Sequence, residues 1–302
     1  MRYPSEIEIQ TDPESLVHYG RDWTRFWSPH PSAIAFPRST EDVVRLVRWA
    51  REQRVALVPS GGRTGLSGGA VATHGELVVS FERMREVLDL DRVEPSIRVQ
   101  AGVPVGEMRR RVEQADLYYP VDWAAADSSH AGGSVATNAG GIRVLRYGMT
   151  RDWVRGLTVV TGAGDVLELN RGLIKNNAGP DLAQLLIGSE GTLGLITEIR
   201  FGLLDPPPAR SVLLLAFSGL PAVMPAFRAL RSALELSAFE FFDRRCVAAV
   251  AAGGHAFPLD EPSPLFAVVE FDDPGASRQE AALAVFETLV EDGQVVDGLI
   301  SQ

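Results

Sequence analysis

The chain has 302 residues, of which 45% are hydrophobic, and a formal net charge of −10 at pH 7. A chain of this length can bury the cores of two domains. The acidic balance argues against nucleic acid as a partner, since that ligand usually meets a basic face.

Three further observations bear on the cellular context. The single cysteine, Cys246, excludes an intrachain disulfide. No apolar run approaches the roughly 18 residues of a membrane-spanning helix, and the N-terminus has no charged-then-apolar signal segment. We therefore expect a cytoplasmic protein without a transmembrane segment. Peripheral attachment to the inner face of a membrane stays open.

The first 204 residues alternate strand-like and helix-like patterns. Residues 1–30 are polar and aromatic, and we expect an irregular arm that packs on the following domain. Apolar positions recur at helical spacing after the potential caps Ser39 and Thr40. Two apolar runs around a Gly-Ala-Gly-Asp turn indicate a hairpin. Strands are predicted at 33–37, 55–58, 77–81, 96–101, 157–161, 166–169 and 193–201, and helices from residue 40, at 108–114 and at 181–186.

The clearest boundary is the run Asp-Pro-Pro-Pro-Ala at 205–209, because consecutive prolines favour an extended, stiff connector. Beyond it the predicted order is β-α-β-(α)-β-α-β, which is typical of a ferredoxin-like unit. Its strands are predicted at 211–217, 238–242, 265–271 and 295–300, and its helices at 220–234, 243–252 and 277–292. The predicted parts are an arm (1–30), a first domain (31–204, with subdomains 31–101 and 102–204), the connector, and a last domain (210–302).

The segment 59–70, Pro-Ser-Gly-Gly-Arg-Thr-Gly-Leu-Ser-Gly-Gly-Ala, lies between two predicted strands. Glycine lets backbone approach a ligand closely, and successive N–H groups can form a concavity for phosphate oxygens. A Walker loop would need a lysine here, but the only lysine in the chain is Lys175. A dinucleotide fingerprint would need GxGxxG leading into a helix. Taken alone, the segment is either a diphosphate cradle or an ordinary glycine-rich loop.

Two further segments are rich in small residues: 131–141, Ala-Gly-Gly-Ser-Val-Ala-Thr-Asn-Ala-Gly-Gly, and 187–198, Ile-Gly-Ser-Glu-Gly-Thr-Leu-Gly-Leu-Ile-Thr-Glu. With the first segment and Arg146-Tyr147-Gly148, they resemble the FAD-linked oxidases of the vanillyl-alcohol-oxidase (PCMH) type. Within that family the motifs are most similar to the D-2-hydroxyacid dehydrogenases, which include D-lactate dehydrogenase, the glycolate oxidase flavin subunit and D-2-hydroxyglutarate dehydrogenase. The resemblance covers about residues 19–300.

The resemblance implies an α+β fold, with a two-part FAD-binding domain followed by a ferredoxin-like cap domain. Members of the family are considerably longer, so we expect the cap to be incomplete and the chain to be truncated at its C-terminus. An alkylglycerone-phosphate-synthase-like flavoenzyme shares the fold and stays an alternative. A UDP-sugar enolpyruvate reductase of the cell wall matches the second and third motifs less well.

The resemblance also implies FAD as the cofactor. Many relatives attach the flavin covalently through a histidine of the glycine loop, but no histidine lies between residues 55 and 73, which implies noncovalent FAD. We expect the first segment to seat the diphosphate, the second to approach the flavin and the third to lie near the adenosine. The expected FAD-binding residues are Pro59, Ser60, Gly61, Gly62, Arg63, Thr64, Gly65, Leu66, Ser67, Gly132, Gly133, Ser134, Thr137, Asn138, Gly141, Ile142, Glu190, Gly191, Gly194 and Ile196.

Three side chains have competing interpretations. Arg63 either neutralises phosphates or is solvated, and we favour solvation because backbone amides suffice in such loops. Glu190 is expected to bond backbone or ribose, although a solvated turn residue would look the same. His130 is a candidate catalytic group, but a lone histidine is more often structural. The other histidines have no metal-ligand spacing, so no metal site is expected.

The reaction implied by the resemblance is oxidation of a D-2-hydroxy acid to the 2-oxo acid, with hydride transfer to flavin N5. A quinone, a cytochrome or an electron-transfer flavoprotein would accept the electrons. In the family, the base, the metal-binding histidines and the carboxylate-binding arginine lie mostly C-terminal to residue 302. We therefore expect FAD binding, with turnover dependent on that missing region. A noncatalytic FAD-binding electron-transfer subunit, or a nonfunctional fragment, is the alternative.

Overall fold

The computed structural model describes residues 3–259, 262–273 and 275–301, and the chain divides into two compact units. The first unit is formed by Met1–Gly140 and Met149–Pro206, and the second by Gly141–Gly148 and Pro207–Gln302. The division after Pro206 falls inside the predicted connector. The segment 141–148, however, was expected in the first domain, whereas its contacts assign it to the second unit.

The first unit begins with a four-stranded sheet in the order β1-β2-β4-β3. Its strands are β1 (Glu8–Gln10), β2 (Ala33–Phe36), β3 (Leu57–Ser60) and β4 (Leu77–Ser80). Strands β2, β4 and β3 run parallel, and β1 pairs antiparallel with β2. The arm is therefore partly regular, because it contributes β1 to this sheet and also forms helix α1 (Pro13–Tyr19). Asp12 caps α1 by accepting a hydrogen bond from the Ser15 amide.

Helix α2 (Thr40–Gln53) connects β2 to β3, as the apolar periodicity predicts. Ser39 caps it by accepting a hydrogen bond from the Asp42 amide. Further along, Arg48 donates to the Gly164 carbonyl at 3.2 Å, and Arg51 donates to the Ala163 carbonyl at 2.9 Å. These bonds fasten α2 to the turn of a second sheet.

The second sheet is antiparallel throughout, in the order β5-β6-β9-β7-β8. Its strands are β5 (Val87–Asp91), β6 (Ser96–Gln100), β7 (Val154–Thr161), β8 (Val166–Leu169) and β9 (Gly194–Gly202). The predicted hairpin is confirmed as β7 and β8. Strand β5 was not predicted. Because β5 belongs to the second sheet, the first sheet ends with β4, whereas the expected subdomain boundary lies at 101/102. Strand β6 pairs with β9, about a hundred residues later, which local patterns do not reveal.

Short helices fill the space around these sheets. They are η1 (Phe81–Arg83), α3 (Val105–Glu113), α4 (Ala131–Ala136), α6 (Thr150–Trp153) and α7 (Ala183–Leu186). A single apolar cluster joins the inner face of the first sheet, α2, α3, α4 and the second sheet. Side chains of β2 alternate, with Ala33 and Ala35 in that cluster and Ile34 and Phe36 in a smaller one beside α1.

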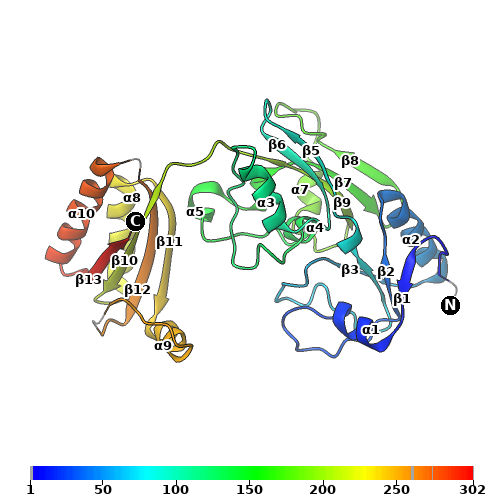
Figure 1. Ribbon diagram of the computed structural model, residues 1–302, viewed down its shortest axis with the longest axis horizontal. Coiled ribbons are helices and arrows are strands. Elements are labelled where there is room, and N and C mark those ends of the chain that lie inside the picture. Colours follow the sequence, from blue (N-terminus) through cyan, green and yellow to red (C-terminus); the bar gives the residue numbers. More distant parts are fainter. Residues whose placement is uncertain (1–2, 260–261, 274, 302) are drawn as a thin grey trace. The chain divides into compact units, whose positions relative to one another are not determined.

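The second unit has an antiparallel sheet in the order β11-β12-β10-β13, which confirms the ferredoxin-like arrangement. Its elements are α5 (Val144–Tyr147), β10 (Arg210–Phe217), α8 (Leu220–Ala233), β11 (Leu236–Asp243), α9 (Arg244–Ala252), β12 (Leu265–Asp272), α10 (Ala276–Glu291) and β13 (Val295–Ser301). Helices α8 and α10 lie together on one face of the sheet (Figure 1), over a core that includes Leu215, Phe217 and Phe271.

Buried charges hold the segment 141–148 within the second unit. Arg143 forms a bidentate pair with Glu270, at 2.7 Å from Nε and 2.9 Å from Nη2, and Ser237 donates to the same carboxylate at 2.6 Å. Arg146 pairs with Asp272 at 2.8 Å. Burial alone would raise the pKa of Glu270, but the bonds from Arg143 and Ser237 outweigh it and hold that pKa below its ordinary value.

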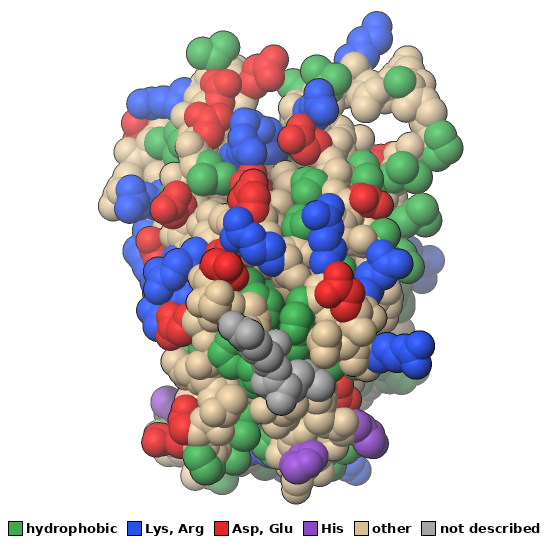
Figure 2. Space-filling model, turned by 90° about the vertical axis from the view of Figure 1, so that its right-hand side faces the viewer, with side chains coloured by type: hydrophobic (Ala, Val, Ile, Leu, Met, Phe, Trp, Pro, Cys, Tyr) green, Lys and Arg blue, Asp and Glu red, His purple; other side chains and the backbone are tan. Residues whose placement is uncertain are grey.

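Figure 2 shows a face of the molecule on which basic and acidic side chains are interspersed. Near the start of the chain, Arg38 and Arg83 each pair with Glu8, and Arg45 pairs with Asp42. Such mixing gives this face no continuous positive stripe.

Candidate cofactor-binding site

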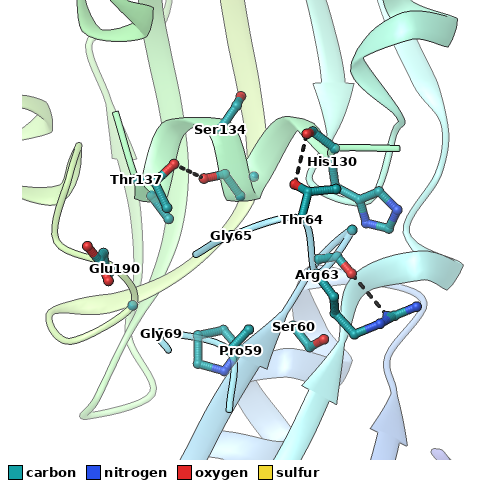
Figure 3. Close-up of a pocket in the computed structure, with 18 of the residues that line it drawn as sticks. Pro59, Ser60, Arg63, Thr64, Gly65, Gly69, His130, Ser134, Thr137 and Glu190 are labelled. Atoms are coloured by element: carbon teal, nitrogen blue, oxygen red, sulfur yellow. Dashed lines mark hydrogen bonds between the residues drawn. The ribbon is translucent and has the colours of Figure 1, made fainter. Parts of the chain in front are cut away.

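The three small-residue segments meet at one pocket in the first unit, with a cavity volume of about 390 Å³. The first segment begins with the last two residues of β3, the second contains α4, and the third ends inside β9. Figure 3 shows Pro59 and Gly65 of the first segment, Thr137 of the second and Glu190 of the third around the same space. The volume is in the range typical of small-molecule and cofactor sites.

Some glycines of the pocket are required by the protein's own packing. A Cβ at Gly62 would lie 1.9 Å from the Ser128 carbonyl oxygen, and one at Gly132 would lie 2.7 Å from the Ala101 Cβ. By contrast, a Cβ at Gly65 or at Gly133 would meet no protein atom within 4 Å. Both residues line the pocket, so glycine there keeps space open for something other than the chain itself.

Two buried polar atoms of the lining have no hydrogen-bond partner among the described residues: Ser60 Oγ and His130 Nδ1. Leaving such an atom unpaired costs about 1–3 kcal/mol, so a ligand or water that pairs with it would be favoured. Burial, with a contribution from the nearby Arg63, lowers the pKa of His130 from 6.5 to about 4. The imidazole is therefore neutral near pH 7. A pocket with unpaired neutral groups and open glycine positions fits a large polar cofactor.

Hydroxyl groups of the lining are mostly held by neighbours. Thr64 Oγ1 lies 3.0 Å from Ser129 Oγ, which also accepts from Trp123 Nε1 at 3.0 Å. In α4, Ser134 donates to the Ala131 carbonyl at 2.8 Å. At the end of this helix, Thr137 donates to the Gly133 carbonyl at 3.0 Å (Figure 3). These hydrogen bonds orient the hydroxyls before a ligand arrives. The hydroxyl oxygens keep lone pairs that can accept hydrogen bonds from a ligand.

Arg63 has protein partners, which corrects the expectation that it is solvated. Its Nη1 donates to the Gly61 carbonyl at 3.1 Å, and its Nη2 lies 3.1 Å from His18 Nε2. The guanidinium also lies over the Tyr19 ring, 4.6 Å from the centroid. The side chain therefore braces the glycine loop against α1. Burial lowers the pKa of Arg63, and burial and this same cation lower the pKa of His18.

The third segment is attached to the end of α4. The Gly188 amide donates to the Val135 carbonyl at 3.0 Å, and the Glu190 amide donates to the Ala136 carbonyl at 2.9 Å. Glu190 has a left-handed backbone with φ of 50°, and its exposed side chain lines the pocket beside Gly69. Its expected bond to backbone or ribose stays a prediction.

Three of the expected FAD-binding residues do not line the pocket: Asn138, Gly141 and Ile142. Asn138 Oδ1 accepts from the Arg151 amide at 3.0 Å, so this side chain supports the chain where it re-enters the first unit. The other two belong to the second unit.

Several lining residues were not expected: Asp22, Gly69, Ala70, Phe81, Ala101, Trp123, Ala125, Ser129, Ala136, Ala139 and Leu195. Some of them lie inside the three motifs and could have been inferred from their neighbours. Asp22 comes from the arm and Phe81 from the start of η1, and only the tertiary structure brings them to the pocket.

Within the described residues, no group of three or more His, Cys, Asp or Glu side chains is arranged to hold a metal ion. No helix in this part of the chain combines the length and apolarity that a membrane span requires.

Comparison with known families identifies both parts of the chain. Residues 31–170 match "FAD binding domain", and residues 206–302 match "FAD linked oxidases, C-terminal domain". The chain belongs to the FAD-linked oxidases.

Curated relatives share much of this sequence. A protein of Xanthomonas citri pv. viticola named D-2-hydroxyglutarate dehydrogenase is 52% identical over 98% of this chain and 63% of its own length. Glycolate oxidase subunit GlcD of Bacillus subtilis is 39% identical over 68% of this chain and 43% of its own length. The chain therefore spans less than two thirds of the length of either relative.

Among solved structures, an alkyldihydroxyacetonephosphate synthase superposes with a TM-score of 0.78, covering 99% of this chain and 58% of its own. Only 21% of residues are identical, so this likeness shows a shared fold and carries no conclusion about activity.

Proposed function

We propose that the pocket binds FAD noncovalently, with the glycine loop against the diphosphate and α4 beside the flavin. The observation that carries this proposal is the open space at Gly65 and Gly133 beside the unpaired Ser60 hydroxyl. The open space and the unpaired hydroxyl do not contribute to the packing of the chain. They suit a ligand that approaches the backbone closely and forms hydrogen bonds.

Noncovalent attachment is supported by the lining itself. His130 is the only histidine, cysteine or tyrosine among the described lining residues, and its Nδ1 is buried. The His18 ring nitrogen near the loop is engaged by Arg63. Covalent attachment of FAD would require the ring of His130 or of His18 to leave its present position.

We further propose that the protein serves the oxidation of a D-2-hydroxy acid to the 2-oxo acid. When bound, FAD supplies the hydride acceptor. The chain's residues hold the cofactor and keep His130 neutral. The proposal rests on the relatives named D-2-hydroxyglutarate dehydrogenase and glycolate oxidase subunit, and it makes a small 2-hydroxy acid the substrate.

The pocket lining does not by itself suggest the base. A His130 pKa of about 4 makes this imidazole a poor proton acceptor at neutral pH, where an effective base has a pKa near 7. Arg63, the only arginine or lysine of the described lining, is directed to Gly61 and Tyr19. We therefore place the base and the substrate's carboxylate-binding cation outside this set of residues.

Two measurements on the purified chain test these proposals. The visible absorption bands of oxidised flavin should accompany the protein or appear on adding FAD, and acid precipitation should release all the flavin into the supernatant. A colourless protein that takes up no FAD refutes the binding proposal. Flavin that stays with the pellet refutes the noncovalent one.

Substrate choice is tested by anaerobic addition of D-2-hydroxyglutarate, D-lactate and glycolate. We expect D-2-hydroxyglutarate to bleach the flavin fastest, because the 52% identical relative carries that name. Bleaching by none of the three, with FAD bound, would favour a noncatalytic electron-transfer role. A quinone, a cytochrome and an electron-transfer flavoprotein can then be compared as acceptors for the reduced flavin.

A further inference from the structure

The N-terminal arm is wrapped along the glycine loop, although it lies outside the matched FAD-binding region, which begins at residue 31. The Trp23 amide donates to the Gly65 carbonyl at 3.2 Å. The Ala72 amide donates to the Gly20 carbonyl at 3.0 Å, and the His30 amide donates to the Ala72 carbonyl at 2.7 Å. The arm thus runs beside the loop, with backbone bonds to Gly65 within it and to Ala72 just after it.

Asp22 is the arm residue that reaches the pocket. Its side chain is buried, with 5% exposure, and it lines the cavity. Oδ2 accepts from the Gly68 amide at 2.8 Å. Oδ1 accepts from the Thr24 amide at 2.9 Å and from the Thr24 hydroxyl at 2.6 Å. Three donors therefore stabilise one buried carboxylate, which a buried charge requires.

Gly68, the loop partner of this carboxylate, has little freedom of its own. Its φ of +83° lies in the left-handed region, and a Cβ there would lie 2.8 Å from the Trp27 ring. The Asp22 bond and the Trp27 ring therefore hold the loop at Gly68 from the side of the arm. Earlier in the loop, Arg63 bonds to the Gly61 carbonyl and to His18 of α1.

We propose that Asp22 is a positioning residue that holds the glycine loop in its cofactor-binding shape, an inference that rests on the proposed binding of FAD. A carboxylate beside a site for an anionic diphosphate repels it, so its presence there needs a compensating contribution. By accepting the Gly68 amide, Asp22 sets the backbone between Gly65 and Gly69, and the three donors offset its charge.

The test compares Asp22→Ala, Asp22→Asn and a matched control, Asp91→Ala. Asp91 also accepts hydrogen bonds from two backbone amides, those of Val93 and Glu94, but it lies at the end of β5 and does not line the pocket. FAD and riboflavin affinities are measured by titration at a temperature at which all variants are folded. Hydrogen exchange of the 65–69 amides is measured in the apoproteins.

We expect Asp22→Ala to weaken FAD about tenfold, the scale of one lost charged hydrogen bond, while riboflavin, which lacks the diphosphate, changes less than about twofold. Asp22→Asn, which keeps an acceptor oxygen, should recover most of the FAD affinity. Exchange at 65–69 should accelerate in Asp22→Ala, and Asp91→Ala should match the wild type in all three measurements.

The inference is overturned if Asp22→Ala leaves exchange at 65–69 unchanged, or if both Asp22 variants bind FAD more tightly, which would make repulsion the dominant effect. Equal losses for FAD and riboflavin would also overturn it. If the wild-type chain binds no FAD, the proposed function fails, and the exchange measurement still decides whether Asp22 positions the loop.

Discussion

Replacing Gly133 by alanine should stabilise the apoprotein and weaken FAD binding at the same time. Gly133 lies inside α4, where alanine is favoured over glycine by about 0.5–1 kcal/mol. A Cβ at this position meets no protein atom within 4 Å, so the protein itself offers no steric penalty. The apoprotein melting temperature should therefore rise by about 1–4 °C.

The new methyl group would occupy space in the pocket that we assign to the flavin. An extra methyl in a closely packed contact typically costs about 1–3 kcal/mol, which is a loss of about 5- to 150-fold in FAD affinity. Flavin fluorescence titration measures the affinity, and a thermal melt without FAD measures the stability. Gly65→Ala should show the same loss of affinity without the helical gain.

The matched control is Gly162→Ala in the β7–β8 turn, where a Cβ also meets no atom within 4 Å and which does not line the pocket. It should leave FAD affinity unchanged. An unchanged affinity in Gly133→Ala, together with the expected rise in melting temperature, would refute the placement of the cofactor against α4. A fall in the apoprotein stability of Gly133→Ala would refute the inference that the space beside Gly133 is open.

Two further predictions concern charge. Because the folded pKa of His130 lies below that of the unfolded chain, its contribution to stability is complete above pH 6.5 and is lost as pH falls towards 4, up to about 3 kcal/mol. Denaturant unfolding of His130→Gln should therefore show a shallower decline than wild type across that window, and parallel curves would contradict the assignment. Glu270→Gln removes the charge that balances Arg143 and Arg210, and should destabilise the second unit by about 3–5 kcal/mol. Denaturant unfolding measures this loss; Glu240→Gln, in the same unit, serves as an exposed control, and equal stabilities would show the pair to be energetically neutral.

The sequence alone predicted most of the local structure and the main segments of the pocket. Apolar periodicity located α2, the helix predicted at 220–234 is confirmed as α8, and the turn of the β7–β8 hairpin was visible in its glycines. The order of elements after the prolines predicted the ferredoxin-like sheet. Glycine and other small residues marked the three segments that meet at the cavity, because close backbone approach to a ligand requires such residues.

Only the tertiary structure decided which distant residues complete the site. Asp22 reaches the pocket from the arm, while Asn138, inside a motif, instead holds the Arg151 backbone. Arg63 was expected to be a solvated loop residue, whereas the structure places it against His18 and Tyr19. Periodicity and turn chemistry are properties of neighbours in the chain, whereas these contacts depend on which elements pack together, and that choice is made by the core as a whole.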